Sequence, residues 1–204
     1  MALGFHIVVA GDRPAEQVFN CTDEVAGSLG FSPRESWENG FQQRSYRRSD
    51  QHPELCFWFD FRPGHCHAAM TPLEEKEVLV YGLDFLVGFW SGLCVHLDAT
   101  LGRTYREGLY GTVDPSEIVG PLRFVDWYQF FSPGIVDRWG LNRLREGPFH
   151  TVEEYPSGAC GIWLSNSPFE RIPRSKAAEY LGVVLPKLYG KNPQTGEPME
   201  ISWG

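Results

Sequence analysis

The 204-residue sequence contains none of the short motifs that mark the common catalytic and nucleotide-binding sites. It has no P-loop, no G-x-G-x-x-G pattern, no G-x-S-x-G nucleophile elbow and no H-E-x-x-H zinc motif. Each of these motifs places backbone donors, a nucleophile or metal ligands in a fixed geometry. Because all are missing, an enzyme assignment has no starting point, and we expect the chain to act by binding another protein.

Cysteine is also sparse and irregularly spaced. The five residues form no C-x-x-C pair, and their number is odd. This pattern favours neither a disulfide framework nor a zinc ribbon, and it fits a reducing compartment. Residues 1–9 lack the basic region and the long apolar run of a secretory signal, and they predict a first strand. We therefore expect a cytoplasmic protein.

The sequence also has fewer basic than acidic residues. The 26 acidic and 18 basic residues give a formal charge of −8. Nucleic acids and anionic membranes bind basic surfaces, so we expect neither as a partner, and no transmembrane span or internal repeat is evident. A cationic protein partner is compatible with this charge. The alternative is that the charge only keeps the protein soluble.

Large aromatic residues are abundant, with seven Trp and fourteen Phe in a chain of single-domain length. We expect one α+β domain over residues 1–190 and a mobile tail over 191–204. The predicted fold is a mostly antiparallel sheet packed against a long central helix and a C-terminal helix. No cofactor is expected.

The hydrophobic pattern and the turn residues predict the order of the elements. Thr71, with Pro72 and Glu74 after it, predicts the cap and first turn of the central helix, whose apolar stripe runs to Leu97. The glycines Gly82, Gly88 and Gly92 in it predict either close packing against other backbone or an end near Gly92. Residues 98–121 read as a loop, and residues 30–53 as a long loop with one edge strand at most. Strands are expected at 1–9, 55–61, 65–70, 122–131, 150–155 and 159–164, and helices at 15–29, 71–92, 132–140 and 176–188.

Two clusters contain residue types that could be reactive. In a strand, His65 and His67 share one face, and Cys56 on the neighbouring strand could complete a metal site, although such a pair is more often a polar sheet face. Cys160 and His150 could form a nucleophile and base in one hairpin. Cys160 lies in an apolar strand, however, which favours a buried, inert thiol. We expect no metal and no catalytic residue.

Acidic residues are concentrated in two places. Glu74, Glu75 and Glu77 lie in the first turn of a predicted helix, where carboxylates favour the positive end of the helix dipole. Glu153 and Glu154 lie on a predicted strand and could be a solvated edge. Both clusters are also candidates for contact with a basic surface.

Residues 124–189 carry a resemblance to a known group of proteins. The pattern begins with an aromatic segment, Val125-Asp126-Trp127-Tyr128-Gln129-Phe130-Phe131, and continues with a short helix that ends in Trp139-Gly140-Leu141. The later segments are, in order, Tyr155-Pro156-Ser157-Gly158, Ile162-Trp163-Leu164-Ser165 with Pro168, and Tyr180 to Leu188 with Pro186. This order resembles the C-terminal half of bacterial immunity proteins of the type VI secretion and polymorphic-toxin families. In those proteins an aromatic strand precedes a helix, a Gly-containing hairpin and a last helix. They usually have a small polar residue at the position of Asp126.

The resemblance implies a protein that binds the catalytic domain of a cognate toxin, such as a nuclease, and blocks its active site or its access to substrate. We expect the interface among the acidic residues and one aromatic: Trp37, Glu74, Glu75, Glu77, Asp114, Glu117, Glu153 and Glu154. One alternative is an enzyme or ligand-binding protein with an aromatic-lined pocket that contains His65, His67, His150 and Cys160. Another is a scaffold subunit that associates with itself.

Overall fold

The computed structural model describes residues 2–34, 42–49, 52–106, 126–169, 174–183, 188–191, 195 and 198–201. Its strands are β1 (Ala2–Ala10), β2 (Ser32–Arg34), β3 (Gln42–Arg47), β4 (Leu55–Arg62), β5 (His65–Glu74), β6 (Leu101–Arg106), β7 (Tyr128–Phe131), β8 (Thr151–Glu154), β9 (Cys160–Trp163), β10 (Leu188–Lys191) and β11 (Pro198–Ile201). Its helices are α1 (Ala15–Ser28), α2 (Glu75–Tyr81), α3 (Leu83–His96), α4 (Pro133–Trp139), α5 (Leu141–Arg145) and α6 (Arg174–Leu181).

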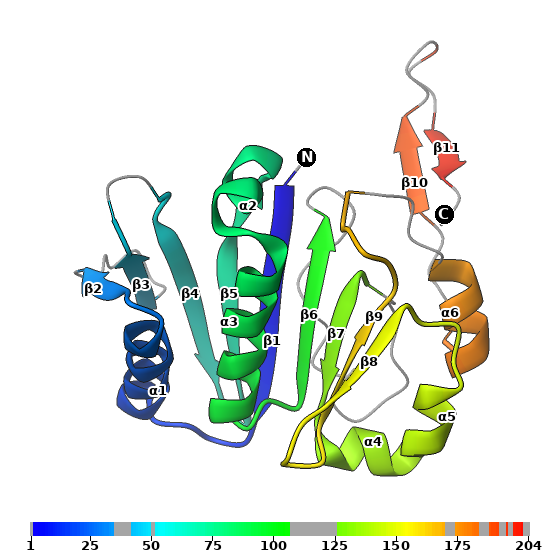
Figure 1. Ribbon diagram of the computed structural model, residues 1–204, viewed down its shortest axis with the longest axis horizontal. Coiled ribbons are helices and arrows are strands. Elements are labelled where there is room, and N and C mark those ends of the chain that lie inside the picture. The colour runs from blue at the N-terminus through cyan, green and yellow to red at the C-terminus, as the bar shows by residue number, and fades with distance from the viewer. Residues whose placement is uncertain are drawn as a thin grey trace.

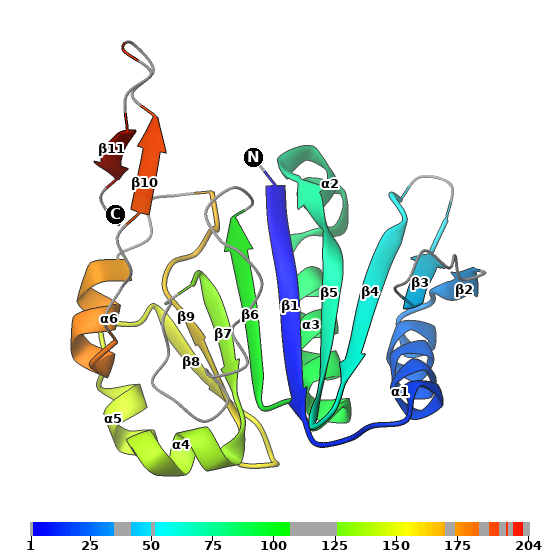
Figure 2. The same ribbon diagram turned by 180° about the vertical axis from the view of Figure 1, so that it is seen from behind.

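Nine strands form one antiparallel sheet in the order β2-β3-β4-β5-β1-β6-β7-β9-β8 (Figures 1 and 2). The first strand lies at the centre, between β5 and β6. Two hairpins, β4–β5 and β8–β9, add neighbouring strands on either side of this centre. The predicted α+β class with a mainly antiparallel sheet is thus confirmed.

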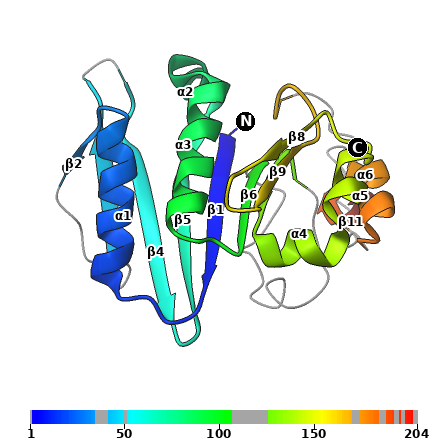
Figure 3. The same ribbon diagram turned by 60° about the horizontal axis from the view of Figure 1, so that its bottom comes forward.

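The helices α1 and α3 pack side by side on one face of the sheet, which we call the helix side (Figures 1 and 3). The core lies between them and the central strands. There Phe5 of β1 meets Trp90 of α3 edge to face, with ring centroids 5.2 Å apart, and both side chains are fully buried. Such a pair adds about 0.5–1.5 kcal/mol beyond its burial. The predicted central helix therefore does organise the core.

The start of that central helix differs from the prediction. Strand β5 continues to Glu74, because Leu73 is buried and the ladder with β1 runs as far as the Ala2–Glu74 pair. Thr71 and Pro72 are therefore strand residues. The N-cap is Glu74, whose backbone N–H donates to Glu77 Oε2 at 2.8 Å in a reciprocal capping box. The sequence correctly predicted a capping box at the start of the helix, but it placed the N-cap three residues too early in the chain.

A glycine also divides the helix. Gly82 has φ +82°, a left-handed conformation that favours glycine, and it separates α2 from α3 at a bend of 83°. Among the described residues no single helix is long and apolar enough to cross a membrane. The bent pair α2–α3 passes that test by length and composition alone, although most of the apolar side chains of α3 are buried in the core.

Other elements differ from the sequence prediction at particular places. The predicted loop at 98–121 contains β6, a strand next to the centre of the sheet, and residues 30–53 contain two strands, β2 and β3, where at most one was expected. Helix α6 ends at Leu181, short of the predicted 188, and β10 begins at Leu188. Strand β10 pairs with β11, so the described residues of the expected tail include one strand, β11, which pairs with a strand that begins before the tail.

Candidate functional site

A groove of about 530 Å³ lies between α3 and the β8–β9 hairpin on the helix side of the sheet. It forms because α3 packs over the centre of the sheet, while β7, β9 and β8 extend beyond it (Figure 1). The segment of α3 from Asp84 to Ser91 makes one wall, and the hairpin makes the other. The lining residues are Asp84, Val87, Gly88, Ser91, Glu153, Glu154, Tyr155 and Trp163.

Two glycines shape the groove. Gly88 lies on an exposed part of α3, and a Cβ at this position would meet no atom within 4 Å, so the helix wall is open at that point. Gly161 of β9 has the opposite surroundings, since a Cβ there would lie 2.8 Å from Tyr128 Oη. The glycine therefore lets the Tyr128 ring lie across β9, next to the floor of the groove.

A chain of hydrogen bonds holds one carboxylate of the groove. Tyr128 Oη and Tyr155 Oη are 3.1 Å apart, and Tyr155 Oη donates to Glu153 Oε2 at 2.9 Å. Burial raises the pKa of Tyr155 to about 12 and raises the pKa of Tyr128 well above its usual value. Both phenols are thus protonated at neutral pH, and Tyr155 remains a donor that orients Glu153.

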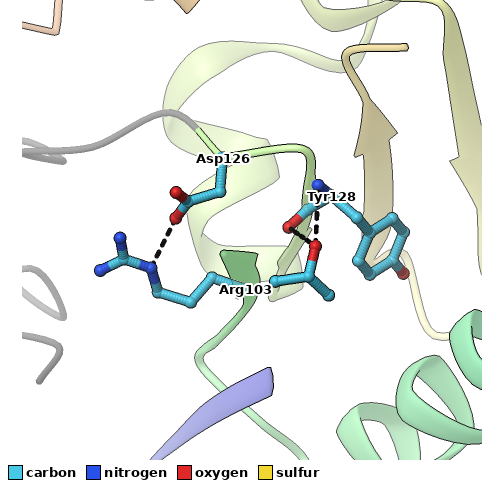
Figure 4. Close-up of polar contacts among 4 residues, drawn as sticks. Arg103, Asp126 and Tyr128 are labelled. Carbon is cyan, nitrogen blue, oxygen red and sulfur yellow. Dashed lines mark hydrogen bonds and ion pairs between the residues drawn. The ribbon is translucent and has the colours of Figure 1, made fainter. Parts of the chain in front are cut away.

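The same part of the sheet contains a buried ion pair on the opposite side of β7. Arg103 Nε of β6 donates to Asp126 Oδ2 at 2.6 Å, and the two side chains are 1% and 0% exposed (Figure 4). Thr104 Oγ1 accepts the Tyr128 N–H at 3.1 Å beside this pair, and the Tyr128 ring points away from it. The ion pair thus fixes the start of the strand that carries Tyr128.

The groove is acidic. Three of the eight described residues that line it are carboxylates, and none of these eight is Lys, Arg or His. Glu154 accepts two hydrogen bonds from Arg145, at 2.6 and 2.8 Å, and these bonds lower the pKa of Glu154. Asp84 and Glu153 have no ion pair within the described part of the chain. The groove therefore offers two carboxylates without a positive partner.

The structure separates the acidic residues that the sequence singled out. Glu153 and Glu154 line the groove, whereas Glu74, Glu75 and Glu77 lie at the start of α2, where Glu74 pairs with Lys76 at 2.8 Å. The remaining three, Trp37, Asp114 and Glu117, lie outside the described residues. Sequence reasoning missed Asp84 and Trp163. The signal for Asp84 was an acidic residue in the first turn of a mainly apolar helix, two residues after Gly82.

The residues of the alternative pocket are not brought together. His65 and His67 lie on β5 with ring centroids 4.8 Å apart, while Cys160 lies on β9, with three strands between β5 and β9 in the sheet, and His150 precedes β8. Cys160 is fully buried, and burial raises the pKa of its thiol to about 12. Among the described residues, no group of three or more His, Cys, Asp and Glu side chains could hold a metal ion.

Comparisons with known proteins show a likeness of fold to solved structures. No protein-family model matches the sequence, and no curated protein sequence matches it. Among solved structures, the Pseudomonas aeruginosa T6SS protein PA0821 superposes with a TM-score of 0.56 over 89% of this chain and 72% of that one. The chain thus has the fold of a T6SS protein. With 11% sequence identity, the likeness concerns the fold alone.

Proposed function

We propose that the protein is an immunity protein, which binds a cognate bacterial toxin and neutralises it by blocking the active site or the access of substrate. The observation that supports this most is the shared fold with a T6SS protein, found over most of the chain. The motif order in residues 124–189 independently resembles immunity proteins of the type VI secretion and polymorphic-toxin families. On this proposal the protein acts in the cytoplasm, and by binding rather than by catalysis.

The charge of the protein supports a cationic partner. The formal charge is −8, and the described residues that line the groove between α3 and the β8–β9 hairpin include acidic and aromatic residues but no basic one. Toxins that cleave nucleic acids need basic substrate clefts, to which an acidic inhibitor is complementary. Complementary charge also raises association rates, which suits an inhibitor that must capture its toxin before damage occurs. A nuclease domain is therefore the partner that we expect.

The test is to purify the tagged protein from its native host and identify the chains that purify with it by mass spectrometry. Each candidate is then expressed alone and together with this protein, and cell survival is measured. The expected result is a tight complex with a protein that is lethal alone and harmless when co-expressed. The proposal would be refuted if the protein captured no toxic partner. It would also be refuted if the protein bound a toxin but did not protect cells from it.

A further inference from the structure

The groove between α3 and the β8–β9 hairpin has a composition suited to a particular kind of ligand. It joins two carboxylates that have no positive partner in the described chain, Asp84 and Glu153, with the aromatic side chains of Tyr155 and Trp163. We propose that this groove binds an arginine-bearing segment of the partner protein. The inference rests on the proposed function, because it assigns the surface that the toxin contacts.

The orientation of Glu153 favours a cationic ligand. Tyr155 Oη donates to Oε2 of this carboxylate at 2.9 Å, which leaves Oε1 to accept from another donor. Asp84 faces it from the helix wall of the same groove. A positive group between the two walls would neutralise charges that otherwise repel each other across a partly enclosed space.

The aromatic wall favours arginine over lysine. Trp163 is held edge to face against Trp127 and Tyr128, with ring centroids at 5.3 and 5.5 Å. A planar guanidinium can stack on a fixed aromatic ring while its N–H groups pair with a carboxylate, whereas an ammonium cannot make the same paired contact.

The chain contains its own example of this recognition. Glu154, on the rim of the groove, is bound by Arg145 through two parallel hydrogen bonds. This is the paired geometry by which a guanidinium recognises a carboxylate. The volume of about 530 Å³ is typical of a ligand pocket and accommodates an arginine side chain with its neighbouring backbone. Gly88 leaves the helix wall open for that backbone.

The first experiment uses a probe that does not depend on the identity of the toxin. The ¹⁵N-labelled protein is titrated with the peptide acetyl-Gly-Arg-Gly-Arg-Gly-amide, followed by NMR, with lysine and glutamate versions of the peptide as controls. We expect shifts of the Gly88 and Gly161 amides and of the Trp163 indole N–H, stronger with arginine than with lysine and absent with glutamate. No shifts at these positions, or equal shifts with all three peptides, would refute the proposal.

Two variants test the groove by different means. Asp84→Asn with Glu153→Gln removes both unpaired charges and should weaken peptide binding about tenfold, which corresponds to about 1.4 kcal/mol. Gly88→Gln fills the open wall at a position where a side chain meets no atom within 4 Å, and it should block binding without unfolding the protein. The matched controls are Glu16→Gln with Glu24→Gln and Gly27→Gln on α1, which should bind as the wild type does.

The same variants separate this inference from the proposed function. If a cognate toxin is found, the groove variants should lose its binding and its neutralisation, while the α1 variants keep both. Full protection by the groove variants would refute the groove and leave the immunity function standing. If no toxin is found, the proposed function fails, and the peptide titration still decides whether the groove selects arginine.

Discussion

Replacing Asp126 with asparagine tests how the polar centre of the sheet is stabilised. The substitution keeps the shape of the side chain but removes the negative charge that accepts from Arg103 Nε at 2.6 Å. Arginine stays protonated, so its charge would remain buried at 1% exposure without this partner. Breaking a buried ion pair from one side costs about 3–5 kcal/mol.

This cost is a large part of the total stability, which for a natural domain is about 5–15 kcal/mol. For a protein of this size, 1 kcal/mol shifts the midpoint of thermal unfolding by about 2–4 °C, so we expect a decrease of roughly 6–20 °C. Urea unfolding followed by tryptophan fluorescence should show a lower midpoint with an unchanged slope. A double-mutant cycle with Arg103→Met then measures the coupling between the two side chains.

The control is Glu154→Gln, which removes the partner of Arg145 at the surface. Both of those side chains are about half exposed, so solvent screens their interaction and the thermal midpoint should change far less. If Asp126→Asn and Glu154→Gln shift the midpoint equally, or if Asp126→Asn leaves it unchanged, the buried pair stabilises the sheet no more than the surface pair does.

Three further predictions concern packing and pH. Gly102→Ala places a Cβ 2.5 Å from Cys94 Sγ and should lower the unfolding free energy by about 1–3 kcal/mol, with partial recovery when Cys94→Ala is added; no recovery would contradict the stated clash. Gly88→Ala adds a side chain where none is opposed and should raise the unfolding free energy by about 0.5–1 kcal/mol in the same assay, whereas a loss would show that the site is not open. Burial lowers the pKa of His6 to about 3 and that of His67 to about 4, from 6.5, so the folded state binds fewer protons than the unfolded chain and the unfolding free energy should fall as the pH drops below 6.5. His67→Gln should make the midpoint of urea unfolding depend less steeply on pH. The same pH dependence in the variant and the wild type would contradict the prediction.

The sequence predicted elements whose residues are themselves typical of one structure. Residues 55–61 combine β-prone aromatics and form a strand as expected, and the leucines at helical spacing in residues 79–97 lie in helices, although Gly82 divides the predicted helix in two. Strand β6 was missed because Gly102 and Arg103 are untypical of a central strand. Position 102 needs a glycine because Cys94 and Trp90 of α3 pack against it. No local sequence pattern reveals this contact.

Asp126 shows the same limit for polar residues. An aspartate in an aromatic strand gives no sign of its partner, since Arg103 lies 23 residues earlier in a stretch that reads as a loop. Only the pairing of β6 with β7 places the two side chains together. The sequence departs from the immunity-protein pattern at this position, and the departure is explained by an ion pair inside the sheet.

Only one wall of the candidate site could be predicted from the sequence, because the other wall comes from a distant part of the chain. Glu153 and Glu154 were found from their charge, but the opposite wall is supplied by Asp84 and Gly88, about seventy residues away in the chain. The groove exists because β9 and β8 extend the sheet past α3, and that strand order follows from long-range pairing. Local patterns can therefore predict one wall of such a site but not the groove.

The arrangement of the groove also bears on how a partner would bind. The Tyr128–Tyr155–Glu153 chain orients one carboxylate before any ligand arrives, and Trp163 is fixed by two neighbouring rings. A site whose groups are already ordered loses little conformational entropy on binding, so more of the interaction energy appears as affinity. Because its two unpaired carboxylates are accessible to solvent, the association rate should fall steeply as salt is added, while the dissociation rate should depend mainly on the aromatic contacts.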